Sequence, residues 1–457
     1  MTHRTTWARQ PHALDLAAVL LALLLGLVLH PTTAQAGTIT AGDPTTTSAD
    51  PKSIVFKIRV QAPAGLQTAT LDYKLFNPDT VVGGSQQAEV NGSTATEATV
   101  TLETNTATRY IPVGSRFTYT WTFVDKEGAK VVTPQREFVF LDGRYQWHEK
   151  TVGTFTVYWY GDNASNADLA LQAAASSTAD NEKLLSVKLN YPIRLVVWRR
   201  ESEGELAQQS RGAAFDRQVI TGGARVAPDV VHLYDPIGGF ADVVRHEVAH
   251  IVTKVAGDGA FGRLPSWLDE GTAVYAQREP GLGYRSAIDA GIRSDGVTRL
   301  RGMTSAANQA SKVDLFYGQS WSTVKFMVDK YGQPKFADLF KTFKAGGDMD
   351  AALKQVYGVD QDGLYNQWRE SVGLKPIDFP PEASTSAPQA QGTRAPLGIG
   401  APGTPGSAAP GGAGDGASTS SAEKSSMTVP AIIVGVVTLL LAAGMGFGAL
   451  RLMKRKA

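Results

Sequence analysis

The residues with the clearest chemical potential form the run His246-Glu247-Val248-Ala249-His250. No proline or glycine interrupts residues 240–256, so this motif is predicted to lie within one helix. Two histidines four positions apart share a helix face, where their imidazoles can bind one metal ion. Glu247 lies about 100° further round the helix, where a general base for a metal-activated water belongs.

A second segment, residues 264–275, can complete the ligand set. Its sequence LPSWLDEGTAVY has a proline near the start and continues as a helix, in which Gly271 permits close packing. A catalytic zinc ion needs three protein ligands and an open position. Glu270 follows His250 by 20 residues and can supply the third ligand.

HEVAH followed by PSWLDEGTAVY resembles the gluzincin metallopeptidases, in particular the peptidase MA-like families and the zinc motifs of the M1 aminopeptidases. The resemblance covers roughly residues 150–373. It implies an α+β zincin-like metallopeptidase domain in which His246, His250 and Glu270 bind Zn²⁺ and Glu247 activates the water. The implied reaction is hydrolysis of a peptide or protein substrate. The GxMEN segment, by which M1 aminopeptidases hold a free N-terminus, is absent, which favours an endopeptidase.

The resemblance also suggests a role for Tyr317. It stands in a segment similar to the YxQS-type segment of peptidase MA-like chains, and its phenol could donate a hydrogen bond to the oxyanion. A packed core tyrosine is the alternative. The carboxylate that orients a ligand histidine in thermolysin-type sites is missing, because Val274 stands four residues after Glu270. Asp269 is a candidate for that role, but we expect an exposed helix carboxylate there.

The role of His232 distinguishes a peptidase from a structural metal-binding protein. On an expected strand at residues 230–234 it is predicted to be an edge or core residue. As a fourth metal ligand it would instead indicate a closed structural site in a surface protein whose metal only stiffens the fold. A third possibility is an inactive gluzincin-like binding or adhesion protein, although the intact triad argues against it.

The elements that must position these residues form two regions. Residues 37–150 show short alternating strands separated by turn signals, which predicts an antiparallel β-sandwich of immunoglobulin or fibronectin III type. We expect it to be a spacer or a substrate-docking module. Residues 151–376 show mixed α/β patterns, with expected strands at 154–160, 193–198 and 230–234, a helix at 167–189, and helices to about residue 373. The family resemblance suggests that residues 222–226 lead into an edge strand that pairs with substrate backbone.

The sequences at both ends of the chain predict export and membrane anchoring. Residues 1–36 have the charge, apolar run and Ala34-Gln35-Ala36 site of a signal peptide, with an uncleaved anchor as the alternative. Residues 377–426 are rich in Ala, Gly, Pro and Ser and are expected to be a disordered stalk. Residues 427–450 are uncharged and long enough for a transmembrane helix, and the basic tail 451–457 would stay in the cytoplasm.

Composition limits the remaining function classes. The chain of 457 residues carries a net charge of +1, and because both ends are basic the body is slightly acidic, so we expect no nucleic-acid partner. The absence of cysteine excludes disulfides, Cys-ligated metals and a thiol nucleophile. The lack of cysteine is also consistent with a protein of a bacterial cell envelope. The sequence therefore predicts a single-pass membrane protein with an extracellular, zinc-dependent peptidase body.

Overall fold

The structure is a computed structural model that describes residues 38–380 except 107, 210–221, 236–238 and 305–309. The expected signal peptide, spanning segment and basic tail, and all but the start of the expected stalk, lie outside the described residues. Among the helices that are described, none combines the length and the apolar character needed to cross a bilayer.

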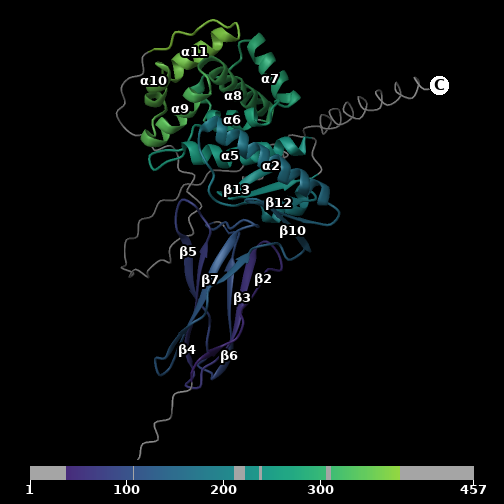
Figure 1. The fold of residues 1–457 in the computed structure, drawn as a ribbon, viewed down its shortest axis with the longest axis vertical. Helices are drawn as coiled ribbons and strands as arrows, with labels where there is room; N and C mark the ends of the chain where they lie inside the picture. Colours follow the sequence, from purple (N-terminus) through teal and green to yellow (C-terminus); the bar gives the residue numbers. More distant parts are fainter. Residues whose placement is uncertain (1–37, 107, 210–221, 236–238, 305–309, 381–457) are drawn as a thin grey trace, which may run out of the picture. The chain divides into compact units, whose positions relative to one another are not determined.

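Two antiparallel sheets form the N-terminal β-rich domain, drawn in purple and blue in Figure 1. The burial of β7 alternates strictly, which places Phe117, Tyr119, Trp121 and Phe123 on its inner face. Phe56 of the facing sheet meets Tyr119 edge to face at 5.1 Å between ring centroids. The first sheet contains β1 (Thr40–Ala41), β2 (Thr45–Thr47), β3 (Ser53–Gln61) and β6 (Ala95–Glu103). The second contains β4 (Leu66–Leu75), β5 (Val82–Gln87), β7 (Arg116–Asp125), β8 (Lys130–Val132) and β9 (Arg136–Val139).

A mixed five-stranded sheet follows, in the order β10-β11-β12-β14-β13. The three inner strands run parallel, and an antiparallel strand flanks them on each side. Every residue of β12 is buried, as expected of a central strand. The strands are β10 (Trp147–Val152), β11 (Phe155–Tyr160), β12 (Ile193–Trp198), β13 (Gly223–Ala227) and β14 (Val230–Tyr234). β10 crosses the expected domain boundary at residue 150.

Two long helices accompany this sheet and pack against each other: α2 (Ala164–Leu185) and α5 (Phe240–Gly257). α5 begins after Gly239, whose φ of 79° lies in the left-handed region, and runs without a helix breaker until Gly257. Between β12 and β13 the described residues form a short turn of helix, α3 (Glu201–Gly204), and the 3₁₀ helix η1 (Glu205–Ala207).

The rest of the described chain is helical, drawn in green in Figure 1. α6 packs on α5 and on α8, and α7 packs on α8. A hydrophobic cluster that includes Trp267, Phe336, Phe340 and Trp368 joins these helices. Their bounds are α6 (Ser266–Ala276), α7 (Leu282–Arg293), η2 (Leu300–Gly302), α8 (Ala310–Tyr331), α9 (Gln333–Gly346), α10 (Met349–Tyr357) and α11 (Gln361–Ser371). A β-rich domain followed by a zincin-like α/β and helical region was expected, and this arrangement is confirmed.

The β-sandwich and the mixed sheet share a hydrophobic core. Ile111, Val113 and Phe140 from the sandwich side belong to the same buried cluster as Val196 and Val230 of the sheet. Gly114 makes this approach possible, because a Cβ at its φ of +94° would come within 2.8 Å of methyl groups on both valines. The sandwich is therefore packed against the sheet by side chains, not joined to it by a linker alone.

Candidate metal centre

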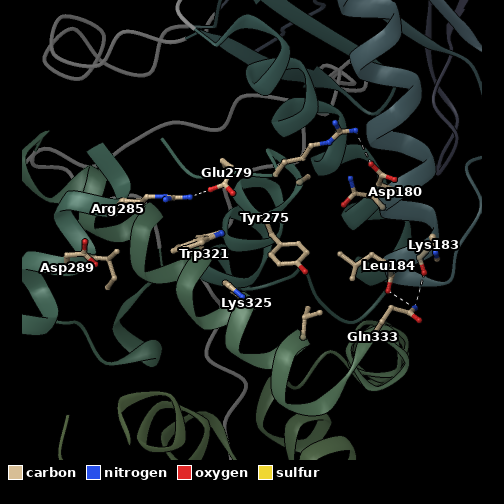
Figure 2. A pocket seen from close by; sticks show the side chains of 15 residues that line it. Asp180, Lys183, Leu184, Tyr275, Glu279, Arg285, Asp289, Trp321, Lys325 and Gln333 are labelled. Carbon is tan, nitrogen blue, oxygen red and sulfur yellow. Dashed lines mark hydrogen bonds and ion pairs between the residues drawn. The ribbon is translucent and has the colours of Figure 1, made fainter. Parts of the chain in front are cut away.

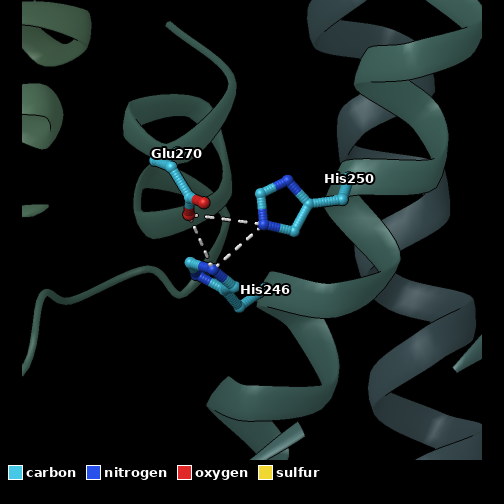
Figure 3. A group of neighbouring side chains, drawn as sticks. All are labelled: His246, His250 and Glu270. Carbon is cyan, nitrogen blue, oxygen red and sulfur yellow. Dashed lines mark hydrogen bonds and ion pairs between the residues drawn. The ribbon is translucent and has the colours of Figure 1, made fainter. Parts of the chain in front are cut away.

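Helix α5 presents the two motif histidines toward α6. Val244, Val248 and Ile251 of α5 are fully buried in the cluster under the mixed sheet, which fixes the rotation of the helix about its axis. His246 and His250 then lie one turn apart, with their rings directed at Glu270 of α6, as Figure 3 shows. The three residues predicted from spacing are therefore brought together.

The separations between the ligand atoms match a zinc site. His246 Nε2 and His250 Nε2 are 3.2 Å apart. Glu270 Oε2 lies 3.3 Å from the first of these nitrogens and 3.4 Å from the second. Ligands at about 2.0–2.1 Å from a tetrahedral zinc ion stand about 3.3 Å from one another. The three atoms thus occupy three corners of a tetrahedron of the right size.

The polar atoms of the site are also consistent with a metal. Glu270 Oε2 is buried and has no hydrogen-bond partner among the described residues, which is costly unless a cation satisfies it. Two imidazole nitrogens and one carboxylate oxygen form a donor set that Zn²⁺ favours and that leaves a fourth position open. His246, His250 and Glu270 therefore fit a catalytic rather than a closed zinc site.

The charges of the site are strongly coupled. Burial would raise the pKa of Glu270, but His250 and His246 outweigh it and hold that pKa far below its usual value. Burial would lower the pKa of His250, but the carboxylates of Asp269 and Glu270 raise it well above its usual value. The carboxylates that raise the pKa of His250 are negative charges that would also favour a metal cation bound at the imidazoles.

Each ligand histidine has a partner on its other ring nitrogen. His250 Nδ1 lies 3.1 Å from Asp269 Oδ1, and Thr253 also hydrogen-bonds to this carboxylate. His246 Nδ1 lies 2.9 Å from the side-chain amide of Gln277. A carboxylate such as that of Asp269 fixes the tautomer and the direction of a ligand imidazole, and the contact with Gln277 restricts the direction of the His246 ring. The expectation that Asp269 is an exposed helix carboxylate is wrong, because α6 turns it toward α5.

Glu247 is buried beside the triad and is held by the edge of the sheet. Its Oε2 accepts a hydrogen bond of 2.8 Å from the backbone N–H of Arg225 on β13. Among the described strands, β13 ends the strand order and pairs only with β14, as expected of an edge strand. The backbone of this strand therefore orients the carboxylate that the motif assigns to general-base catalysis.

Tyr317 also comes to the site, on α8. Its ring centroid lies 6.1 Å from that of His246, so its phenol is in the neighbourhood of the ligands. Sequence reasoning missed a second tyrosine, Tyr284 of α7, which stacks on Tyr317 at 5.2 Å between centroids. No motif marks Tyr284, because its position depends on how α7 packs against α8.

His232 lies elsewhere. It is fully buried in β14, and its Nε2 donates a 2.8 Å hydrogen bond to the carbonyl oxygen of Val113 in the sandwich domain. It is outside the only group of three or more possible ligands found among the described residues. His232 is thus a core residue of the junction, and no fourth protein ligand is found in the part of the chain that the structure describes.

A large cavity of about 880 Å³ lies near the C-terminal end of α6 and does not contain the ligands (Figure 2). Tyr275 and Trp321 form part of its wall, and charged side chains of α2 and α7 line it as well. Gln277 lies between the cavity and the metal centre. Its sequence neighbours Ala276 and Arg278 line the cavity, whereas its own side-chain amide contacts His246. The chemistry therefore belongs to the triad and not to this cavity.

Comparison with known proteins gives one family match. Residues 182–373 match the family described as the Peptidase MA superfamily, which is less than half of the chain. No curated protein matches. The matched region contains all three ligands, Glu247 and Tyr317. This region is gluzincin peptidase-like, and the superfamily implies Zn²⁺, which the His-His-Glu group fits.

Solved structures give weaker likenesses. An aminopeptidase N family protein from Idiomarina loihiensis is 8% identical with a TM-score of 0.35, over 75% of this chain and 77% of that one. An M1 zinc metallopeptidase from Deinococcus radiodurans is 11% identical with a TM-score of 0.31, over 76% and 96%. OgpA from Akkermansia muciniphila is 12% identical with a TM-score of 0.18, and the match spans 24% of this chain and 29% of OgpA. The assignment of the site rests on the family match and on the side chains.

Proposed function

We propose that the protein is a membrane-anchored, extracellular zinc peptidase that hydrolyses internal peptide bonds, with Glu247 as its general base. The observation that carries the proposal is the tetrahedral spacing of the three ligand atoms beside a buried, oriented Glu247. A zinc ion bound there would polarise the scissile carbonyl and lower the pKa of a water molecule.

The side chains of the chain supply the remaining steps. Glu247 takes a proton from the attacking water, whose oxygen bonds to the carbonyl carbon. The C–N bond then breaks, and Glu247 delivers that proton to the leaving nitrogen. Tyr317 donates a hydrogen bond to the oxygen that becomes negative. Among the described strands β13 lies at the edge of the sheet, and its outward backbone groups other than the Arg225 N–H, which donates to Glu247, would pair with an extended peptide.

The first experiment measures metal and activity together. The intact chain should hold one zinc per molecule, and Glu270→Ala should lose it or bind it much more weakly, because two imidazoles alone leave the site incomplete. Glu247→Gln should keep the zinc and lose at least about 10²-fold in the rate of cleavage of an unstructured protein substrate. Glu370→Gln, an exposed change on α11, is the matched control.

The results separate the alternatives. An intact chain without zinc, or a fully active Glu247→Gln variant, would contradict the proposed mechanism. A peptide blocked at its N-terminus distinguishes the two classes of peptidase. Its cleavage supports the endopeptidase, and cleavage only of free N-termini would assign an aminopeptidase.

The anchor rests on sequence alone and has its own test. Residues 427–450 are uncharged and precede a basic tail. The full chain should remain with membranes after a high-salt wash, and a chain ending at residue 426 should be released. Release of the full chain by salt would contradict a membrane-spanning anchor.

A further inference from the structure

Tyr317 is in contact with two other rings of the site. Its ring meets that of His246 at 62°, and it stacks on Tyr284 with only 21° between the ring planes. Stacked and edge-to-face aromatic contacts restrict how a ring can turn and shift. The direction of the Tyr317 hydroxyl is therefore limited by His246 and by Tyr284.

The backbone holds Tyr284 in this position. A Cβ at Gly318 would lie 2.4 Å from the carbonyl oxygen of Tyr284, so α7 and α8 approach closely at the residue after Tyr317. The same stretch of chain also carries Gln277, whose amide contacts His246. Residues 277–284 thus contact both a zinc ligand and the phenol beside it.

The surroundings keep the Tyr284 phenol neutral. Burial and, to a smaller extent, the negative charges of Asp314, Glu270 and Glu247 together raise its pKa to about 12. Among the described residues no hydrogen bond to its hydroxyl is found. The Tyr284 side chain contacts Tyr317 through its ring. We therefore expect the ring, and not the hydroxyl, to matter for function.

We propose that Tyr284 is a positioning residue of the peptidase reaction: its ring holds Tyr317 beside His246 so that the Tyr317 hydroxyl stays directed at the developing oxyanion. This inference rests on the proposed function. It predicts that the ring of Tyr284 matters, that its hydroxyl does not, and that its whole effect passes through Tyr317.

The experiment is a double-mutant cycle on the full-length protein loaded with zinc. Tyr317→Phe should lower kcat by about 10²-fold, the lower end for one oxyanion donor. Tyr284→Leu, which removes the ring, should lower kcat by about 10-fold or more with KM changed by less than about threefold. Tyr284→Phe keeps the ring and should restore kcat to within about twofold of the unchanged protein. The double variant Tyr284→Leu/Tyr317→Phe should be no slower than Tyr317→Phe alone.

A second stacked pair provides the control. Tyr357 stacks on Tyr331 at 4.2 Å between centroids and 22° between planes, and neither belongs to the triad or its contacts. Tyr357→Leu removes a similar contact and should leave kcat unchanged. A loss of kcat in this variant as large as in Tyr284→Leu would mean that any lost stack lowers activity, which would overturn the proposal.

Other outcomes would also overturn it. They are an equal loss in Tyr284→Phe and Tyr284→Leu, losses that multiply in the double variant, loss of zinc from Tyr284→Leu, or no effect of Tyr317→Phe. Failure of the proposed function looks different, because the unchanged protein would then lack zinc or Glu247→Gln would remain fully active.

Discussion

His250 illustrates how single residues prepare this site. One ring nitrogen faces the metal position, and the other lies 3.1 Å from the carboxylate of Asp269. Asp269 and Glu270 are neighbours in sequence, so one turn of α6 supplies both a ligand and the group that orients another ligand. A carboxylate behind an imidazole also makes that imidazole a better metal ligand.

Replacing Asp269 by Asn should therefore weaken zinc binding without removing it. We expect the zinc dissociation constant to rise by about 10–100-fold, the usual effect of losing such a partner. Competition with a chelator of known affinity measures this change. Asp289→Asn, exposed on α7, is the control and should bind zinc like the unchanged protein. Equal affinities for the Asp269 and Asp289 variants would show that the contact with His250 has no such role.

Sequence reasoning reached the three ligands and Glu247 but not their partners. The ligands follow from spacing along one helix and from the segment that carries Glu270. Asp269, Gln277 and Tyr284 depend on how α6 and α7 approach α5 and α8, and one sequence does not encode that approach in any local pattern. Asp269 was even assigned to solvent, because a helix carboxylate without its tertiary contacts looks exposed.

At the scale of elements, the packing of α6 on α8 keeps Glu270 in place. Gly271, the next residue, makes this possible, because a Cβ there would meet the backbone oxygen of Ser320 at 2.4 Å. Backbone cannot move aside as a flexible side chain can. α6 is thus held between α5, which carries the histidines, and α8, which carries Tyr317.

Gly271→Ala should force these helices apart. We expect a loss of about 1–3 kcal/mol in the free energy of unfolding, typical of an overpacked core, together with weaker zinc binding. Chemical denaturation at constant zinc concentration measures the first effect. Gly346→Ala near the end of α9 is the matched control, since nothing lies within 4 Å of its added Cβ. A Gly271→Ala variant as stable as the Gly346→Ala variant would contradict the packing constraint.

Helices and strands with a strong hydrophobic pattern could be predicted from the sequence, whereas elements with a weak pattern could not. The strand at residues 193–198 and the helix around the motif match β12 and α5 closely, because each has a continuous apolar or periodic signal. β5, with the sequence VGGSQQ, has almost no apolar pattern, so no local signal in the sequence marks it as a strand. It forms because it pairs with β4, a contact between separate segments.

At the scale of the whole described molecule, the junction between the sandwich and the mixed sheet contains titratable groups. Arg194 of β12 donates to the carbonyl of Gly114 and pairs with buried Asp229. His232 is buried nearby in the same sheet, and burial lowers its pKa to about 4 despite its hydrogen bond to Val113. This histidine is therefore neutral in the folded protein at neutral pH.

The junction should weaken in acid because of His232. Its folded pKa of about 4 lies below the ordinary value of 6.5, so the unfolded chain takes up the proton first as the pH falls. Stability should be complete above about pH 6.5 and should fall progressively toward pH 4, by up to about 3 kcal/mol. Thermal unfolding at pH 7 and pH 4.5 measures the change.

The control for this prediction is His232→Gln, which keeps a donor for Val113 but does not titrate in this range. Because all other acidic and basic groups are shared, the unchanged protein should lose more stability between pH 7 and pH 4.5 than the variant. Equal losses in the two proteins would assign the acid sensitivity to other groups, such as the zinc ligands.

The common core at this junction has a consequence for cooperativity and for modularity. Since Val113 and Val230 lie in one cluster, melting of either domain exposes apolar surface on the other. We expect a single calorimetric transition for both, with equal calorimetric and van't Hoff enthalpies. Two separate peaks would contradict this. The matched segment 182–373 begins within α2 and omits the sandwich, so we expect that it does not fold on its own. A different sandwich could replace this one only if it brought a matching apolar face with it.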